Sequence, residues 1–341
     1  MVSLRDVLSS NARIKGELPP RLVAVFAGAT TGIGEATLKT FVKYAVEPRI
    51  YFFARNPTSA ERVVAECKII NAQAQIEIIK ADLSLVRDTD RACDVVKAKE
   101  TSVNLVFMSM GEVRLDRALS PEGLHHFMGT VYYNRIRIPQ NLLPLLVRAS
   151  TTSPLARVLD VAGGTKEGYI DTSDISALRI PFRQIRPHLT SMHTLALESL
   201  ADQAPTVSFV HDFPGAVLTP LYDEIPGLAG FGMRILGKVL WLFSRWMVVP
   251  LEESGERHVF LGTSAKYPPG EGDAAGVGLA DGMETNKTTD RLQCGVYSVD
   301  WDCEGPGQHV IRLLKGLREN GVKEKVWEHT NSEFERITNG K

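Results

Sequence analysis

A glycine-rich turn that could hold phosphate lies near the start of the chain. It has the pattern G-x-x-x-G-x-G, follows an apolar run at residues 22–28 and precedes a helix-like stretch. Glycines let the backbone approach a pyrophosphate, and the free N–H groups at the start of the next helix stabilise its negative charge. Glycines also serve ordinary loops, but a strand before the turn and a helix after it favour a dinucleotide site. We expect contacts from Gly28, Thr30, Thr31, Gly32, Ile33 and Gly34.

The end of the second apolar run indicates which dinucleotide would bind. An aspartate or glutamate at this position accepts hydrogen bonds from the ribose 2′-hydroxyl of NAD. Here Arg55 occupies the position, 21 residues after Gly34, with Asn56 beside it. A guanidinium suits a 2′-phosphate, so the sequence predicts NADP(H) as the cofactor. The alternative is that Arg55 is an ordinary solvated surface arginine.

Three further segments add to this site and carry a family resemblance. They are Asp82-Leu83 after the third apolar run, Ser109 and Gly111 at the end of the fourth, and Pro214-Gly215-Ala216-Val217-Leu218-Thr219 after the sixth. In this order, and together with the glycine turn, the first and the last of these segments resemble the short-chain dehydrogenases/reductases over residues 22–219. In the segment between them only Gly111 keeps the family pattern, and Ser109 could line the cofactor cleft. The resemblance implies that Asp82 holds the adenine and that Pro214, Val217 and Thr219 lie against the nicotinamide carboxamide.

A nearer resemblance is to dehydrogenase-like members of that family from filamentous fungi, many of them from secondary-metabolite pathways. It rests on the segments LPPRLVAVFAGATTGIGEAT, YYNRIR, GGTKEGYIDTSD and SFVHDFPG. The resemblance implies an oxidoreductase on a Rossmann fold.

The catalytic pattern of the family is missing from this chain. In the family, a serine, a tyrosine, a lysine four residues later and a helix asparagine assist hydride transfer to a carbonyl. Their places fall on Ala162 or Gly163, on His188, on Met192 and on Val131, and residues 160–230 contain no Tyr-x-x-x-Lys. Because hydride addition to a carbonyl creates an alkoxide, another group must then supply the proton.

Three side chains are candidate replacements. We expect His188 to be the general acid, because an imidazole has an unperturbed pKa of ~6.5 and reaches both protonation states at neutral pH. Thr165 could hydrogen-bond a substrate oxygen, and Asn134, one helical turn beyond Val131, could replace the missing amide. The alternatives are a hydrogen-bonded structural histidine and a hydroxyl that stabilises a turn.

Other polar side chains add little to this site. Lys166 and Tyr169 follow Thr165 in the same loop and could reach a cleft above the strand ends, or lie on the surface. The remaining histidines, among them His193 and His211, show no metal-ligand spacing, so we expect no metal site.

Alternating strands and helices would bring these residues to one edge of a sheet. Apolar runs at 22–28, 49–55, 76–82, 104–111, 157–163 and 207–215 alternate with helix-like stretches, and 294–300 could add a last strand. Strands separated by helical crossovers predict an α/β fold with a doubly wound parallel sheet. We expect one Rossmann domain over 21–341, with an N-terminal arm at 1–20 and a C-terminal extension at about 270–341.

An apolar segment follows the sixth strand. Residues 231–250 contain three charges, Arg234, Lys238 and Arg245, on a narrow arc of a helix, which disfavours a transmembrane span. The position resembles the family's mobile lid, so we expect a lid over about 216–255. Its apolar face favours a hydrophobic small-molecule substrate; an oligomer contact, a peripheral membrane contact and a buried structural helix are alternatives.

Composition argues against several other classes of protein. The 341 residues include 39 basic and 40 acidic ones, so the chain lacks the excess of positive charge that is typical of nucleic-acid-binding proteins. The four cysteines show neither disulfide nor metal spacing, and the first 20 residues lack the apolar stretch of a signal peptide. These features favour a reducing, cytoplasmic location.

The sequence therefore predicts an NADPH-dependent oxidoreductase for a hydrophobic small molecule, in fungal secondary metabolism, with altered catalytic residues. Two alternatives stay open. One is a non-redox isomerase, dehydratase or cyclase on the same scaffold, and the other is a non-catalytic NADP(H)-binding protein.

Overall fold

A parallel seven-stranded sheet forms the centre of the molecule. The computed structural model describes residues 1–112, 116–219, 248–286, 288 and 294–340. The sheet order is β3-β2-β1-β4-β5-β6-β7, and every neighbouring pair is parallel. The strands are β1 (Val23–Ala27), β2 (Arg49–Ala54), β3 (Gln75–Lys80), β4 (Leu105–Met108), β5 (Arg157–Val161), β6 (Ser208–Asp212) and β7 (Val296–Val299). The predicted α/β Rossmann architecture is confirmed.

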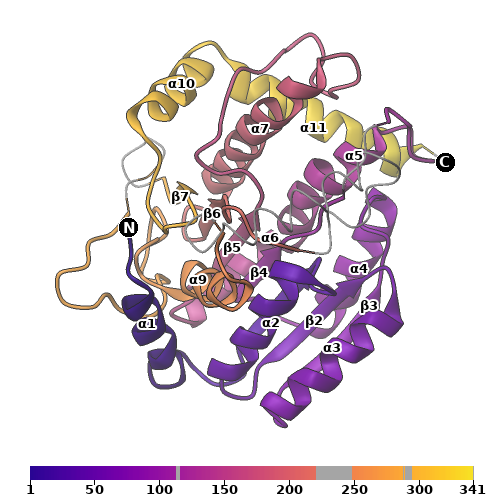
Figure 1. The fold of residues 1–341 in the computed structure, drawn as a ribbon. Coiled ribbons are helices and arrows are strands. Elements are labelled where there is room, and N and C mark those ends of the chain that lie inside the picture. The colour runs from indigo at the N-terminus through magenta and orange to yellow at the C-terminus, as the bar shows by residue number, and fades with distance from the viewer. Residues whose placement is uncertain (113–115, 220–247, 287, 289–293, 341) are drawn as a thin grey trace.

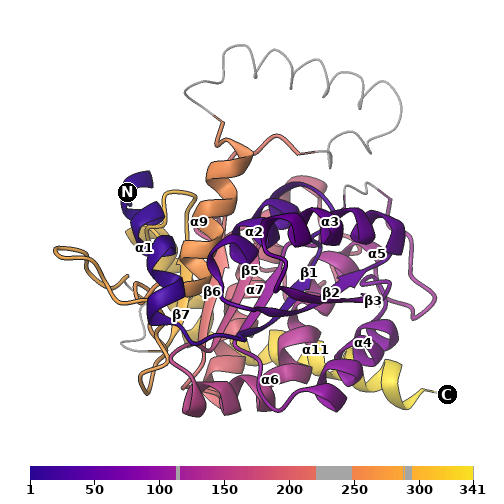
Figure 2. The same ribbon diagram turned by 90° about the horizontal axis from the view of Figure 1, so that it is seen from below.

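Helices cover both faces of this sheet, as Figures 1 and 2 show. One face carries α2, α3 and α9, and the other carries α4, α6 and α7. Because both faces are covered, the inner strands are buried along their whole length, whereas the edge strand β3 is only partly covered. The helices between strands are α2 (Gly32–Tyr44), α3 (Pro57–Ile70), α4 (Val86–Lys99), α6 (Asn134–Thr152), α7 (Phe182–Gln203) and α9 (Leu251–Thr263).

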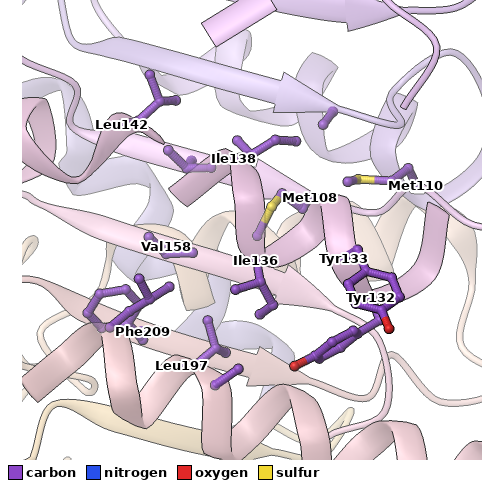
Figure 3. Close-up of a cluster of buried hydrophobic side chains, with 14 of the residues drawn as sticks. Met108, Met110, Tyr132, Tyr133, Ile136, Ile138, Leu142, Val158, Leu197 and Phe209 are labelled. Carbon is purple, nitrogen blue, oxygen red and sulfur yellow. The ribbon is translucent and has the colours of Figure 1, made fainter. Parts of the chain in front are cut away.

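The core beneath α6 and α7 is densely apolar. Figure 3 shows Met108, Val158 and Phe209 of the sheet facing Ile136 of α6 and Leu197 of α7. The short α5 (His126–Met128) and the π-helical turn η1 (Gly129–Tyr133) precede α6.

Two helices occupy segments where the sequence predicted none. α1 (Leu4–Glu17) lies in the region expected to be an N-terminal arm; the Ser3 hydroxyl caps it, and it packs on α9. α9 begins inside the region expected to be a lid and is largely buried against α2. Most of that predicted lid, including residues 231–247 of the apolar segment with its three cations, lies outside the described residues.

The predicted C-terminal extension contributes to both the sheet and a helical layer. β7 forms the edge of the sheet beside β6, and α10 (Gln308–Glu319) leads into α11 (Val322–Asn339). α11 packs across α7 and α4, where the Tyr132 hydroxyl of η1 bonds the Thr330 hydroxyl at 2.8 Å. Among the described residues, no helix combines the length and the apolar character needed to cross a membrane.

Candidate functional site

The glycine turn between β1 and α2 brings the start of α2 close to the end of β4. Gly28 has a φ of +82°, and a Cβ there would lie 2.3 Å from the backbone nitrogen of Met110. A Cβ at Gly34 would lie 2.3 Å from the Gly28 carbonyl oxygen. Both positions therefore require glycine. Thr31 is the N-cap of α2, but its side chain makes no capping hydrogen bond, so the first N–H groups of the helix are available to an anion.

Segments after β4 and β6 meet this turn. Gly32 has a φ of +59°, and a Cβ there would lie 3.1 Å from the methyl carbon of Thr219. The Ser109 hydroxyl donates to the Gly28 carbonyl oxygen at 3.0 Å. Val217, two residues before Thr219 in the chain, is buried. The other predicted residues of these segments are half-buried or exposed: Thr30, Ile33, Gly111 and Pro214. The structure thus gathers them at the carboxyl edge of the sheet, where dinucleotides bind in open α/β folds.

The end of β2 presents an arginine to solvent. Arg55 is exposed, and its guanidinium makes no hydrogen bond or ion pair with any described residue. The Asn56 side chain caps α3. Sequence reasoning missed Arg62 on α3, which donates to the Thr30 carbonyl at 3.1 Å and pairs with Glu35 at 2.6 Å. Arg62 therefore braces the glycine turn with its charge compensated, whereas the charge of Arg55 faces solvent.

In the turn after β3, the Asp82 side chain forms hydrogen bonds within the turn itself. The Asp82 carboxylate accepts hydrogen bonds from the Ser84 N–H at 3.0 Å and from the Ser84 hydroxyl at 2.8 Å, while Leu83 is buried. Asp82 is half-buried at the same edge as Arg55. The contact of Asp82 with adenine stays a prediction.

His188 is bound to the backbone on both sides of its ring. It lies within α7, not in a loop, and only 1% of it is exposed. Its Nδ1 accepts from the Asp171 N–H at 3.2 Å, and its Nε2 donates to the Ile175 carbonyl at 3.1 Å. Burial lowers the pKa of His188, which favours the neutral ring. These contacts indicate that His188 anchors the 171–175 loop, and they do not support the prediction that His188 is a general acid.

Thr165 and Asn134 also hold local structure. Thr165 has a φ of +65°; its N–H donates to the Ser298 hydroxyl at 2.6 Å, and its own hydroxyl donates to Asp300 at 3.0 Å. Asn134 is buried, and its amide donates to a carbonyl of η1 at 3.0 Å. No hydrogen bond joins Thr165, Asn134 and His188 to one another in the described part of the chain. The three predicted catalytic residues therefore hold separate turns.

A row of buried polar side chains crosses the sheet beneath α7. Asp160, His211 and Ser298 are register partners on β5, β6 and β7, and all three are fully buried. His193 and Thr194 of α7 contact this row. Sequence reasoning missed the row, although a carboxylate in RVLDV and an imidazole in SFVHD stand out within apolar strands.

His193 lies at the centre of the row, between a carboxylate and a backbone carbonyl. Its Nδ1 lies 2.6 Å from the Asp160 carboxylate, and its Nε2 lies 2.7 Å from the Val131 carbonyl. Arg135 pairs with the other Asp160 oxygen at 2.5 Å. Burial alone would raise the pKa of Asp160, but His193 and Arg135 hold that pKa well below its usual range. A carbonyl and an ionised carboxylate only accept, so both His193 nitrogens donate.

Three side chains of this row are grouped as metal ligands could be, but hydrogen bonds already occupy their ring nitrogens. Ligand atoms of Asp160, His193 and His211 lie within 4.8 Å of one another, a grouping that the sequence spacing did not reveal. His211 Nε2 accepts from the Gly163 N–H at 3.1 Å, and its Nδ1 donates to the Thr194 hydroxyl at 2.9 Å. Burial and the neighbouring His193 lower the pKa of His211 to about 3. Since every ring nitrogen already has a partner, the arrangement favours a hydrogen-bond network over a metal ion.

The network ends at a buried carboxyl group. Glu167 Oε1 accepts from the Thr194 and Ser298 hydroxyls at 2.8 and 2.6 Å, while its Oε2 is buried without a hydrogen-bond partner in the described residues. Burial raises the pKa of Glu167, although both hydroxyls oppose this effect. The loop after β5 is thus tied to α7 and β7 through a carboxyl that favours its protonated form.

Comparison with known proteins places these residues in a family. Oxidoreductase andH of Emericella variicolor is 36% identical over 344 residues, which cover 99% of this chain and 98% of that protein. The short-chain dehydrogenase/reductase SAT2 of Stachybotrys chartarum is 28% identical over 92% of each chain. This chain belongs to the short-chain dehydrogenase/reductase superfamily. The resemblance drawn from the motifs to the fungal branch of this superfamily is confirmed.

A solved structure supports the fold. A short-chain dehydrogenase/reductase from Burkholderia xenovorans matches with a TM-score of 0.52 and 19% identity, covering 72% of this chain and 92% of that one. No family model matches the chain.

The places of the family's catalytic residues lie beside the buried histidine pair. The Gly163 N–H, at the serine place, is bound by His211. Met192, at the lysine place, is buried next to His193 in the sequence of α7, and the Val131 carbonyl, at the asparagine place, accepts from His193. In this chain, a histidine network therefore contacts the backbone at positions where the family pattern would place a serine and an asparagine.

Proposed function

We propose that this protein is an NADP(H)-dependent oxidoreductase that acts on a hydrophobic small molecule in fungal secondary metabolism. The observation that carries the proposal is the uncapped start of α2 behind a glycine cradle, with the exposed guanidinium of Arg55 at the next strand end. Membership of the superfamily supports a nicotinamide cofactor.

The residues of the carboxyl edge suit such a dinucleotide. The first N–H groups of α2 would hold the pyrophosphate, and Arg55 would pair with the 2′-phosphate. Arg62 would keep the glycine turn in place through its bond to the Thr30 carbonyl. The segment Pro214–Thr219 would lie along the nicotinamide half, close to the ends of β5 and β6. When bound, the nicotinamide supplies or accepts the hydride.

A cytoplasmic location is part of the proposal. None of the four cysteines, all of which lie in the described residues, forms a disulfide, and Cys67, Cys93 and Cys303 are buried. Free thiols suit a reducing compartment.

Substitution of Arg55 tests the cofactor assignment. The variant Arg55→Asp should bind NADPH about 10- to 100-fold more weakly, because a hydrogen bond to a charged group contributes roughly 1.5–3 kcal/mol. NADH affinity should stay the same or improve, as measured by fluorescence titration. Arg312→Asp, at an exposed arginine of α10, is the matched control and should change neither affinity. If Arg55→Asp keeps wild-type NADPH affinity, the preference for the phosphorylated dinucleotide is wrong.

A further inference from the structure

Two cations converge on one aromatic ring where β6 ends. Phe213 directly follows β6 and is partly exposed. The Lys166 Nζ lies 4.8 Å from the centroid of this ring, and the Arg186 Cζ lies 4.9 Å from it. Lys166 comes from the loop after β5 and Arg186 from the second turn of α7, so the fold brings together three segments. We call Lys166, Phe213 and Arg186 the cationic corner.

The loop that carries Lys166 is held in a strained conformation. Thr165 is β-branched and adopts a φ of +65°, a strained backbone conformation that persists only where neighbours impose it. Ser298 and Asp300 bind the N–H and the hydroxyl of Thr165, and Asp300 also binds the Lys166 ammonium at 2.6 Å. Contacts from the end of β7 therefore hold the Lys166 side chain in one place.

The corner has an excess of positive charge. Asp300 balances Lys166, whereas the exposed guanidinium of Arg186 makes no hydrogen bond or ion pair with any described residue. A guanidinium that lies over an aromatic face keeps its N–H donors for a planar anion such as a carboxylate.

A second aromatic side chain lies close to the corner. Trp301, which follows Asp300, is 38% exposed, and its Cβ lies 2.9 Å from where a Cβ of Gly215 would stand. Phe213 directly precedes Pro214 in the chain and Trp301 packs against Gly215, so both aromatic side chains lie beside the start of the segment assigned to the nicotinamide. Flat apolar groups pack well on such surfaces.

We propose that the cationic corner binds an anionic oxygen group, a carboxylate, on a flat apolar substrate. The inference rests on the proposed function, because it places this group beside the nicotinamide half of the dinucleotide site. Arg186 supplies the donors and Lys166 adds a fixed charge, while Phe213 and Trp301 contact the apolar body.

Matched pairs of small probes test this subsite. Benzoate, cinnamate and 1-naphthoate are titrated into protein saturated with NADP⁺, each beside its neutral amide, and binding is followed by calorimetry. At least one carboxylate should bind 10-fold or more tightly than its amide, and Arg186→Gln should remove that preference. Arg183→Gln, at an exposed arginine one turn earlier on α7 with no contact to Phe213, is the control and should keep it.

Three outcomes would overturn the subsite. One is that no carboxylate in the series exceeds its amide; another is that Arg186→Gln keeps the preference; the third is that Arg183→Gln loses it equally, which would indicate a diffuse surface charge. Both positions are exposed, so circular dichroism should show an unchanged fold. NADPH affinity is measured on the same samples. If the wild-type protein does not bind NADPH, the proposed function is refuted. If it binds NADPH but shows no preference for a carboxylate over its amide, only the subsite is refuted.

Discussion

His193 is buried between the Asp160 carboxylate on one side and the Val131 carbonyl on the other. Asp160 also pairs with Arg135, so replacing His193 leaves this carboxylate its arginine partner but removes the hydrogen-bond donor of the Val131 carbonyl. A buried acceptor without a donor costs about 1–3 kcal/mol. His193→Leu should therefore lower the free energy of unfolding by roughly 1–3 kcal/mol in urea denaturation. His309→Leu, at an exposed position of α10, is the matched control and should be nearly neutral. Wild-type stability in His193→Leu would refute the structural role given to His193.

His211 should make stability depend on pH. Its pKa falls to about 3 in the folded chain, against ~6.5 in the unfolded chain, so the unfolded state binds a proton first. The contribution of His211 is fully present above pH 6.5 and is lost as the pH falls toward 3, by up to about 1.4 kcal/mol per pH unit.

Comparison with a variant isolates this contribution. Urea unfolding at several pH values between 7 and 4 should show a shallower loss of stability in His211→Asn than in the wild type. The pKa of His188 is also lowered, but that effect is common to both proteins and cancels in the difference. Parallel curves would contradict the role given to His211.

At the scale of elements, α9 and α2 pack so closely that they leave no room for a side chain at Gly255. A Cβ there would lie 2.9 Å from the Ala36 carbonyl oxygen. Gly255→Ala should therefore lower stability by about 1–3 kcal/mol through overpacking. Gly16→Ala in α1, where a Cβ meets nothing within 4 Å, should instead raise it by about 0.5–1 kcal/mol. Thermal unfolding of both variants measures the contrast; equal shifts would show that the α2–α9 contact is looser.

The strands were predictable from the sequence because a strand buried on both faces reads as a short apolar run. RIYFFAR and RVLDVAG are such runs, and β2 and β5 lie within them. α9 was missed because Arg257 and His258 interrupt its apolar pattern, and only tertiary partners explain their burial: Arg257 donates to the Val2 carbonyl, and Asp212 binds His258.

At the scale of the whole molecule, the position of the glycine turn between β1 and α2 was predictable and the polar network was not. The glycine turn and the Pro214–Thr219 segment are local patterns, and the spacing of their residues along the chain is enough to identify them. Asp160, His193 and His211 instead converge from three elements, and nothing in their spacing along the chain indicates that their ligand atoms lie within 4.8 Å of one another. For the same reason, the sequence indicated Lys166 as a candidate site residue but not that Phe213 and Arg186 lie beside it.

Calorimetric titration of NADPH into the folded wild-type protein tests the central claim most directly. We predict saturable binding of one dinucleotide per chain, and its loss in Gly34→Val, because a Cβ at Gly34 would lie 2.3 Å from the Gly28 carbonyl oxygen. Folded protein that binds neither NADPH nor NADH, or a Gly34→Val variant that binds as the wild type does, would contradict the dinucleotide site at the glycine turn.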